Sequence, residues 1–146
     1  MKFNNIALDL NLLNVFGLSI ILCIAFALQL LLHELPCPLC LLQRFGLLAI
    51  SFGMLLNLHD RIRPRYYALS ILACIYTAIV ATRQILLHIV PGTGSYGNVF
   101  LGLHLYTWTL ILTLLILLSI TLMLALYKAK KNIKKTTTIH PIGTWA

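Results

Sequence analysis

The chain has 146 residues, room for a single domain, and 60% of them are hydrophobic while only 10% are charged. A domain of this composition folded in water would expose a continuous apolar surface, so the composition excludes a soluble globular protein. The net charge of +8 does not indicate nucleic-acid binding, because the basic residues gather in short clusters next to apolar runs. We therefore expect a membrane protein that contacts lipid and no nucleic acid.

The first predicted element is a transmembrane helix over residues 10–32, a run without a charged residue. At about 1.5 Å per residue, this run can cross a hydrocarbon core about 30 Å thick. Ala25-Phe26-Ala27 resembles a signal-peptidase site, so cleavage near Ala27 has to be considered. The apolar run is too long for a signal peptide and continues past Ala27, which favours a retained helix.

Three further apolar runs predict helices over residues 38–58, 66–88 and 105–127. An Arg-rich loop, in which Pro64 blocks helix continuation, separates the second helix from the third. The turn-rich residues 91–98 separate the third helix from the fourth. Short connections favour an up-down arrangement, so we expect an all-α membrane protein with one four-helix transmembrane bundle over residues 1–127.

Small residues inside these helices indicate where they pack. Gly17, Gly46 and Gly53 all lie within predicted spans. In lipid, helices associate through close packing rather than through a hydrophobic driving force, and glycine lets two backbones approach. We therefore expect helix contacts at these three positions.

The basic clusters predict the orientation of the bundle. One is the loop 59–65 and the other is the lysine-rich stretch 128–146. Basic residues beside membrane spans stay in the cytoplasm, so we expect both termini there, in a multi-pass protein of the bacterial inner membrane. Residues 128–146 are expected to form a disordered basic tail near anionic lipid. The segments 33–40 and 89–104 then face the periplasm.

Most of the remaining ionisable residues converge on that outer face. They are His33, Glu34, Cys37, Cys40 and Arg44 from the first segment, and Arg83, His88 and His104 from the second, joined there by the polar amide of Gln84. Charged and polar side chains at membrane depth are costly, so such a group is by default a candidate functional site. Cys23 and Cys74 lie in mid-helix without charged neighbours, and we expect them to be structural.

Cys37 and Cys40 are the centre of this candidate site. Pro38 suits the first helical turn, which places the pair at a helix N-terminus, where the dipole and free N–H groups favour a thiolate. Arg44 follows one turn after Cys40 on the same face and adds a positive charge. Thiolates attack disulfides and electron-poor rings, and disulfides persist outside the bacterial inner membrane. Thiol redox chemistry is therefore the leading interpretation.

Other interpretations of these residues remain open. The two cysteines could form a static disulfide or be inert. Together with His33, His88 or His104, two thiolates could instead complete a tetrahedral zinc or soft-metal site, in a protein that binds or hands on metal without catalysis. The arginines could extend to the lipid interface, and Tyr106 and Trp108 could belong to an aromatic belt.

The outer-face residues resemble the disulfide bond formation protein B (DsbB) family, membrane thiol oxidoreductases that pass electrons to quinone. The resemblance is carried by Pro36-Cys37-Pro38-Leu39-Cys40-Leu41-Leu42-Gln43-Arg44, by Ala81-Thr82-Arg83-Gln84 leading to Pro91, and by Leu101-Gly102-Leu103 followed by Trp108. It spans residues 10–127 in order and leaves the lysine-rich tail outside.

This resemblance implies a quinone-dependent protein disulfide oxidoreductase that supports periplasmic disulfide bond formation, with ubiquinone or menaquinone as cofactor. Cys37 and Cys40 would be the catalytic pair, with Cys37 exchanging with an incoming thiol protein and Cys40 facing the quinone. Arg44 would stabilise negative charge on the quinone oxygen and on the thiolate. His88 would border the quinone, which supplies the redox chemistry.

The chain departs from the family pattern in the second outer loop. Family members usually have a long loop there, with another cysteine pair that takes electrons from a DsbA-like periplasmic thiol oxidase. In this chain residues 91–104 form a short loop without cysteine. Either such a partner reacts directly with Cys37, or another protein provides the missing dithiol, or the chemistry has been repurposed.

Overall fold

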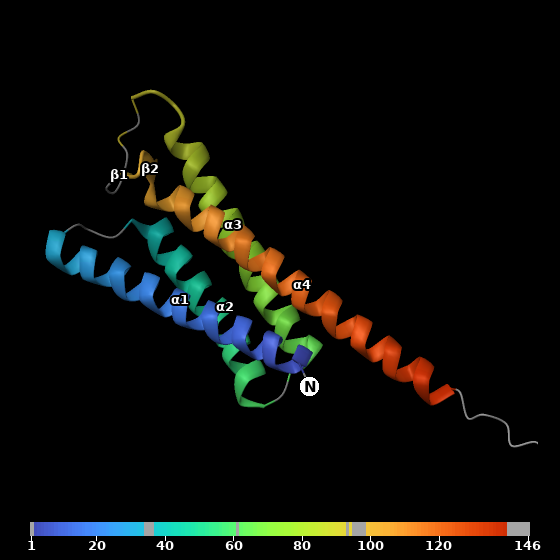
Figure 1. The fold of residues 1–146 in the computed structure, drawn as a ribbon. Helices are drawn as coiled ribbons and strands as arrows, with labels where there is room; N and C mark the ends of the chain where they lie inside the picture. The colour runs from blue at the N-terminus through green and yellow to red at the C-terminus, as the bar shows by residue number, and fades with distance from the viewer. Residues whose placement is uncertain (1, 34–36, 61, 93, 95–98, 140–146) are drawn as a thin grey trace, which may run out of the picture.

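The computed structural model describes residues 2–33, 37–60, 62–92, 94 and 99–139. Its elements are α1 (Lys2–Leu32), α2 (Pro38–His59), α3 (Pro64–His88), β1 (Val99–Phe100), β2 (Leu103–His104) and α4 (Leu105–Ile139) (Figure 1). All four helices are long and apolar enough to cross a membrane. The prediction of an all-α membrane protein with four transmembrane helices is therefore confirmed.

Two helices are longer than the sequence predicted. α1 begins at Lys2 rather than at residue 10, and α4 continues to Ile139 rather than ending at residue 127. Once a helix is nucleated its propagation costs little, and Lys and Ala are good helix formers. The expected disorder of the tail is thus corrected for residues 128–139, which are helical. Residues 140–146 lie outside the described part of the chain.

α2 and α3 form the closest helix pair of the bundle. A Cβ atom added at Gly46 would collide with the side chain of Thr77. One added at Gly53 would collide with the hydroxyl of Ser70 and lie 3.1 Å from the backbone N of Ser70. The predicted close contacts at these two glycines are confirmed. The prediction for Gly17 is wrong, because nothing lies within 4 Å of its added Cβ.

α1 and α4 are joined to the bundle by polar bonds between side chains. Asn11 Nδ2 of α1 donates to Tyr67 Oη of α3 at 2.7 Å, and Tyr67 Oη donates to Met123 Sδ of α4 at 3.3 Å. Asn14 Nδ2 donates to Ser119 Oγ at 2.9 Å, which links α1 directly to α4. In lipid such bonds contribute about 0.6–2 kcal/mol each, so they help to hold the outer helices in the bundle.

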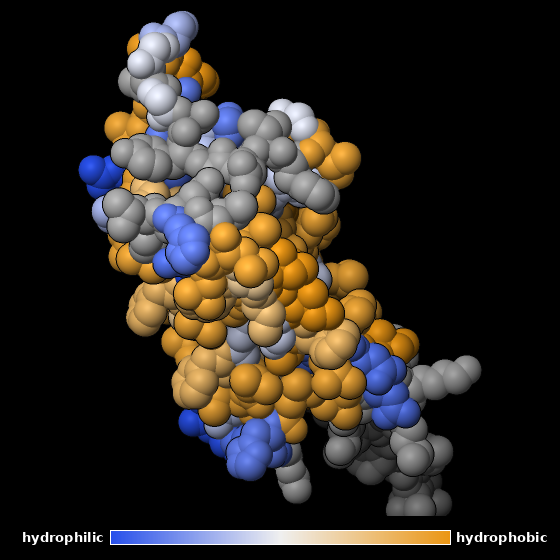
Figure 2. All heavy atoms as spheres, turned by 90° about the vertical axis from the view of Figure 1, so that its left-hand side faces the viewer, coloured by the Kyte–Doolittle hydropathy of each residue, from blue (hydrophilic) through white to orange (hydrophobic). Residues whose placement is uncertain are grey.

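The outside of the bundle is an apolar band between two polar ends, as Figure 2 shows for one face. Large side chains such as Phe45, Leu72 and Leu118 are 66% exposed within this band. Such side chains in the middle of long helices are solvated by lipid. We call the end that carries residues 99–104 and the start of α2 the hairpin end, and the opposite end, where His59 and Arg63 lie, the loop end.

A short hairpin covers part of the hairpin end. β1 and β2 pair antiparallel, with Phe100 opposite Leu103. Leu101 and Gly102 form the turn, and both have positive φ, of 51° and 80°. Two consecutive positive-φ residues give the turn geometry that matches the twist of paired strands. The hairpin leads directly into α4 and was not predicted from the sequence.

Candidate functional site

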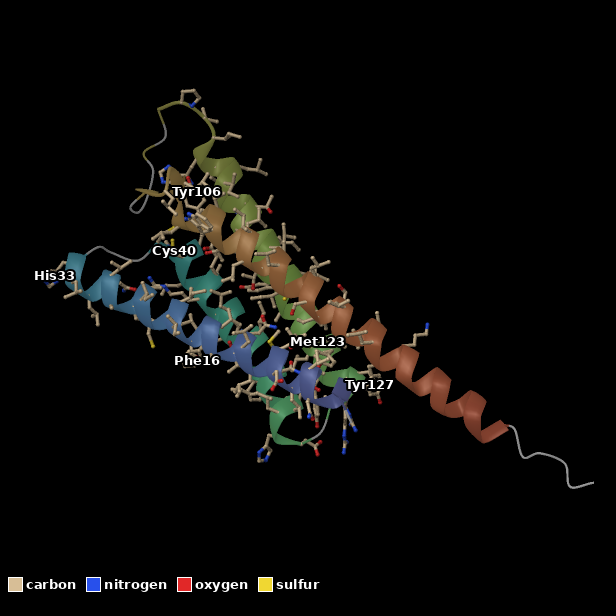
Figure 3. The ribbon with its side chains drawn as sticks, viewed as in Figure 1. Phe16, His33, Cys40, Tyr106, Met123 and Tyr127 are labelled. Carbon is tan, nitrogen blue, oxygen red and sulfur yellow. The ribbon has the colours of Figure 1, made fainter. Side chains whose placement is uncertain are left out.

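Cys37 and Cys40 lie at the start of α2, at the hairpin end (Cys40 is labelled in Figure 3). Cys37 is the N-cap residue, with φ −58° and ψ 135°, and Pro38 begins the helix. The ring of Pro38 fixes a helical φ, and its missing N–H would have had no acceptor within the helix. The Leu41 N–H closes the first turn onto the Cys37 carbonyl at 3.1 Å. Both sulfurs therefore lie where the helix dipole favours negative charge.

Both thiols approach the side-chain amide of Gln84 on α3. Gln84 Nε2 lies 3.3 Å from Cys40 Sγ and 3.9 Å from Cys37 Sγ. Gln43 Nε2 donates to Gln84 Oε1 at 2.8 Å, and both glutamines are buried. The two cysteines are free thiols and half-buried. The amide pair therefore connects the thiols of α2 to α3.

Arg44 turns away from the thiols and toward α1. Nη1 donates to Gln29 Oε1, and Nη2 donates to the Ala25 carbonyl at 3.1 Å. The guanidinium carbon lies 4.9 Å from the centroid of the Phe26 ring. This side chain is half-buried and engaged by α1, so it does not simply extend into the lipid interface. Two of its five N–H donors are used by these bonds.

His88 lies one turn after Gln84 on α3 and belongs to a stack of three rings. Its Nδ1 lies 2.7 Å from the Gln84 carbonyl, so this nitrogen carries the hydrogen. The His88 ring stacks on Tyr106 of α4, with centroids 5.5 Å apart and planes at 28°. Tyr106 in turn stacks on His104 of β2, at 5.1 Å and 14°. Tyr106 is buried in this stack, and α3, α4 and the hairpin meet there.

A comparison with protein families identifies the chain. The family model described as disulfide bond formation protein DsbB matches residues 8–96, more than half of the sequence. The chain belongs to the DsbB family. This DsbB-family protein is accordingly a multi-pass membrane oxidoreductase of disulfide bond formation. No curated protein and no solved structure matches it.

The match includes α2 and α3 completely and ends before the hairpin. The thiols, Gln43, Arg44, Gln84 and His88 therefore lie inside the part that resembles DsbB. His104 and Tyr106 lie beyond it. The ring stack thus joins His88, inside the matched region, to two residues beyond it.

Several predicted members of the outer-face group are not brought together. Figure 3 shows His33 at the far end of α1, well separated from Cys40. Arg83 is exposed and lines a shallow groove on α3 and α4 with Ile79 and Leu117. Glu34 lies outside the described residues. His104 does join the site, through Tyr106.

The structure also places the other two cysteines and bears on the alternative of a metal site. Cys74 is fully buried in the core, and Cys23 is exposed on α1. Across the described residues, no three His, Cys, Asp or Glu side chains are grouped so that they could hold a metal ion. The described residues therefore provide no set of three such ligands for the metal-binding alternative.

Sequence reasoning missed three contributors to the site. From the sequence, Gln43 appears only within a motif, Gln29 only within an apolar span, and an aromatic belt is the favoured interpretation of Tyr106. A signal existed for Gln29, because a polar residue inside a membrane span needs a partner. For Tyr106 no signal existed, since the hairpin that positions it against His88 was not foreseen.

Proposed function

We propose that this DsbB-family protein is a quinone-dependent thiol:disulfide oxidoreductase with Cys37 and Cys40 as its redox pair. The observation that carries the proposal is the placement of both thiols at the N-terminus of α2, beside the buried Gln84 amide. Arg44 adds a positive charge one turn further along the helix. The helix N-terminus, the amide N–H and this charge each stabilise the thiolate, which is the species that exchanges with disulfides, while the partial burial of Cys40 opposes it.

In the first half of the reaction, a thiolate of a partner protein attacks Sγ of Cys37 in the oxidised pair. The bond between Cys37 and Cys40 breaks, its electron pair leaves on Cys40 Sγ, and a mixed disulfide with the partner forms. The second thiolate of the partner then attacks the partner's own sulfur in that bond and releases Cys37. The partner has lost two electrons, and the pair is now a dithiol.

The partner is a periplasmic thiol oxidase of the DsbA type or another thiol protein. Residues 91–104 contain no cysteine that could act as an intermediate carrier. Direct reaction of the partner at Cys37 is therefore the simplest route. The hairpin and the start of α2 form the surface that such a partner would have to bind.

A bound membrane quinone would accept the two electrons and two protons of the dithiol and so restore the disulfide. The donor set near the thiols fits such a group. Arg44 retains N–H donors beyond those given to α1, and Phe26 offers an aromatic face beside the guanidinium. We assign Arg44 to the stabilisation of negative charge on a quinone oxygen and His88 to the border of the same site.

We also propose that the hairpin end faces the periplasm and that both termini lie in the cytoplasm of a bacterial inner membrane. Arg63, Arg65 and Lys128 belong to the basic clusters away from the thiols. Basic residues that flank membrane spans are retained in the cytoplasm. In this orientation the thiols face the oxidising compartment.

The redox state of the pair in native membranes tests the proposal. Thiol trapping should find Cys37 and Cys40 oxidised when quinone is present and accumulated as dithiol after quinone depletion. Cys37→Ser and Cys40→Ser should each abolish disulfide-forming activity in vivo. Cys23→Ser is the control and should retain this activity, because Cys23 is exposed on α1. Full activity in both of the first two variants would end the proposal, and stoichiometric zinc or copper in the purified protein would support metal binding instead.

A further inference from the structure

We propose that the Gln84 amide, oriented by Gln43, is the hydrogen-bond donor that stabilises the thiolate form of Cys40 relative to that of Cys37 and makes Cys40 the leaving group of the pair. This inference rests on the proposed function, because it assigns a direction to the exchange described there. It depends on three observations, namely the orientation of the amide, the unequal distances to the two sulfurs and the helix register that places Gln84.

The orientation of the Gln84 amide follows from its bond to Gln43. Gln43 Nε2 donates to Gln84 Oε1 at 2.8 Å, so the NH₂ group of Gln84 must point to the opposite side, where the sulfurs lie. The exposed fractions are 0% for Gln84 and 5% for Gln43, so water does not compete for these groups. A flipped amide would set two NH₂ groups against each other and a carbonyl oxygen against the thiols. That arrangement leaves buried donors unsatisfied and is therefore disfavoured.

The distances to the two sulfurs distinguish Cys40 from Cys37. Gln84 Nε2 is 3.3 Å from Cys40 Sγ but 3.9 Å from Cys37 Sγ. A hydrogen bond to a charged acceptor is stronger than one to a neutral acceptor, so the nearer sulfur gains more as a thiolate. Thiol–disulfide exchange is faster when the leaving sulfur is the better stabilised thiolate. An incoming thiolate is therefore directed to Cys37, and the electron pair of the broken bond goes to Cys40.

The register of α2 against α3 explains why Gln84 reaches the thiols. Ser70, Thr77 and Gln84 follow one another at intervals of seven residues on α3. Ser70 packs against Gly53 and Thr77 packs against Gly46, at the close approach of the two backbones. Gln84 is the next member of this row toward the hairpin end, where α2 begins with the thiols. Gln43 is thus a positioning residue for the Gln84 amide. The contacts at Gly46 and Gly53 set the distance between α2 and α3 at which the two glutamines can bond.

The experiment measures alkylation of the reduced protein across a range of pH, without quinone and without a partner, and resolves Cys40 and Cys37 by peptide mass spectrometry. Gln84→Met keeps the side-chain length but removes the N–H donor. Its Cys40 should contain about tenfold less thiolate at a given pH, which moves the half-maximal alkylation about one pH unit upward. Gln43→Met leaves the Gln84 amide in place but free to rotate, so a smaller upward shift is expected.

Ser51→Ala is the matched control, because it removes a buried side-chain bond of α2, to the Leu47 carbonyl at 3.0 Å, away from the thiols. It should not move the alkylation profile of Cys40. An unchanged profile in a folded Gln84→Met protein would overturn the inference, and so would a shift confined to Cys37. If Gln84→Met fails to fold, Gln43→Met decides, and an unchanged profile there overturns the inference as well.

The alkylation experiment can fail or succeed independently of the tests of the proposed function. Alkylation needs neither quinone nor partner, so loss of the quinone hypothesis would leave the shift in Gln84→Met intact. Conversely, inactive Cys37→Ser and Cys40→Ser variants together with an unshifted Gln84→Met profile would keep the proposed function and remove only the role of the amide.

Discussion

The inner helices α2 and α3 and the outer helices α1 and α4 are held in the bundle in different ways. About two fifths of the apolar stretch is buried in each inner helix (39%), against 17% in α1 and 22% in α4. The inner pair packs backbone to backbone at Gly46 and Gly53, while α1 depends on side-chain bonds such as that between Asn11 and Tyr67. Figure 1 shows α1 beside α2 and α4 beside α3.

This difference divides the candidate site into two parts. The thiols and the Gln84 amide lie on the inner pair, so their geometry depends on close packing. Arg44 and His88 also belong to the inner pair, but their partners, Gln29 and Tyr106, come from α1 and α4. We therefore expect disturbances of the outer helices to change the surroundings of Arg44 and His88 more than the arrangement of the thiols.

The largest expected effect comes from filling the space between the inner helices. Gly53→Val would force side-chain atoms into Ser70 and toward the backbone of α3, and overpacking of this kind costs about 3 kcal/mol. Thermal unfolding in detergent should show a clear loss of stability. Gly17→Val is the control, because nothing lies near its Cβ position, and it should change stability by no more than about 0.5 kcal/mol. Equal losses in the two variants would contradict the tight inner pair.

The next effect concerns the contact of Arg44 with α1. Arg44→Leu should keep membrane insertion but lower turnover at limiting quinone about tenfold, because stabilisation of a charged oxygen is lost. Arg83→Leu is the matched control, since Arg83 is an exposed arginine of α3 that lines a groove with Ile79 and Leu117. Rates measured against quinone concentration check this. An unchanged dependence on quinone in Arg44→Leu would refute the assignment.

A smaller effect is expected where the outer helices attach. Tyr67→Phe removes the hydroxyl that accepts from Asn11 and donates to Met123. Loss of this bridge should lower stability by about 1 kcal/mol. The alkylation profile of Cys40 should stay the same, since the α2–α3 contacts are untouched. A shift in that profile would show that the outer helices also control the thiols.

The smallest effect is expected from the end of α4. A protein truncated after Lys128 should keep its redox activity in purified form, because the removed residues lie beyond the apolar span Leu105–Lys128. Its binding to anionic vesicles should weaken by about 1 kcal/mol per lost basic residue near the surface. Loss of the purified protein's activity would place part of the chemistry at the loop end.

Much of the bundle could be predicted because its signals are local. Uncharged runs long enough to span a bilayer identify four helices, and Pro38 between the cysteines marks the start of α2. Gly46 and Gly53 signal close packing because a missing side chain has few other uses in a membrane helix. The same reasoning failed at Gly17, since a glycine shows that an approach is possible but does not supply a partner helix.

The missing part of the prediction concerns contacts between distant segments. Gln84 was identified as polar, but no pattern in one sequence shows that its amide faces Cys40 rather than lipid. That contact depends on the rotation of α3 against α2. Tyr106 depends likewise on a turn at Leu101 and Gly102, where a non-glycine residue adopts positive φ without a clear sequence signal.

The length of α4 has a practical consequence. Its 35 residues make a rod about 52 Å long, whereas a bilayer core is about 30 Å thick. The turns after Lys128 therefore continue the helix axis beyond the lipid, as Figure 1 shows for the part that extends past the other helices. A helical fusion joined in phase after Ile139 would inherit this axis and turn with the protein. Such a rigid marker would give a 16.4 kDa membrane protein enough mass and shape to be oriented in single-particle images.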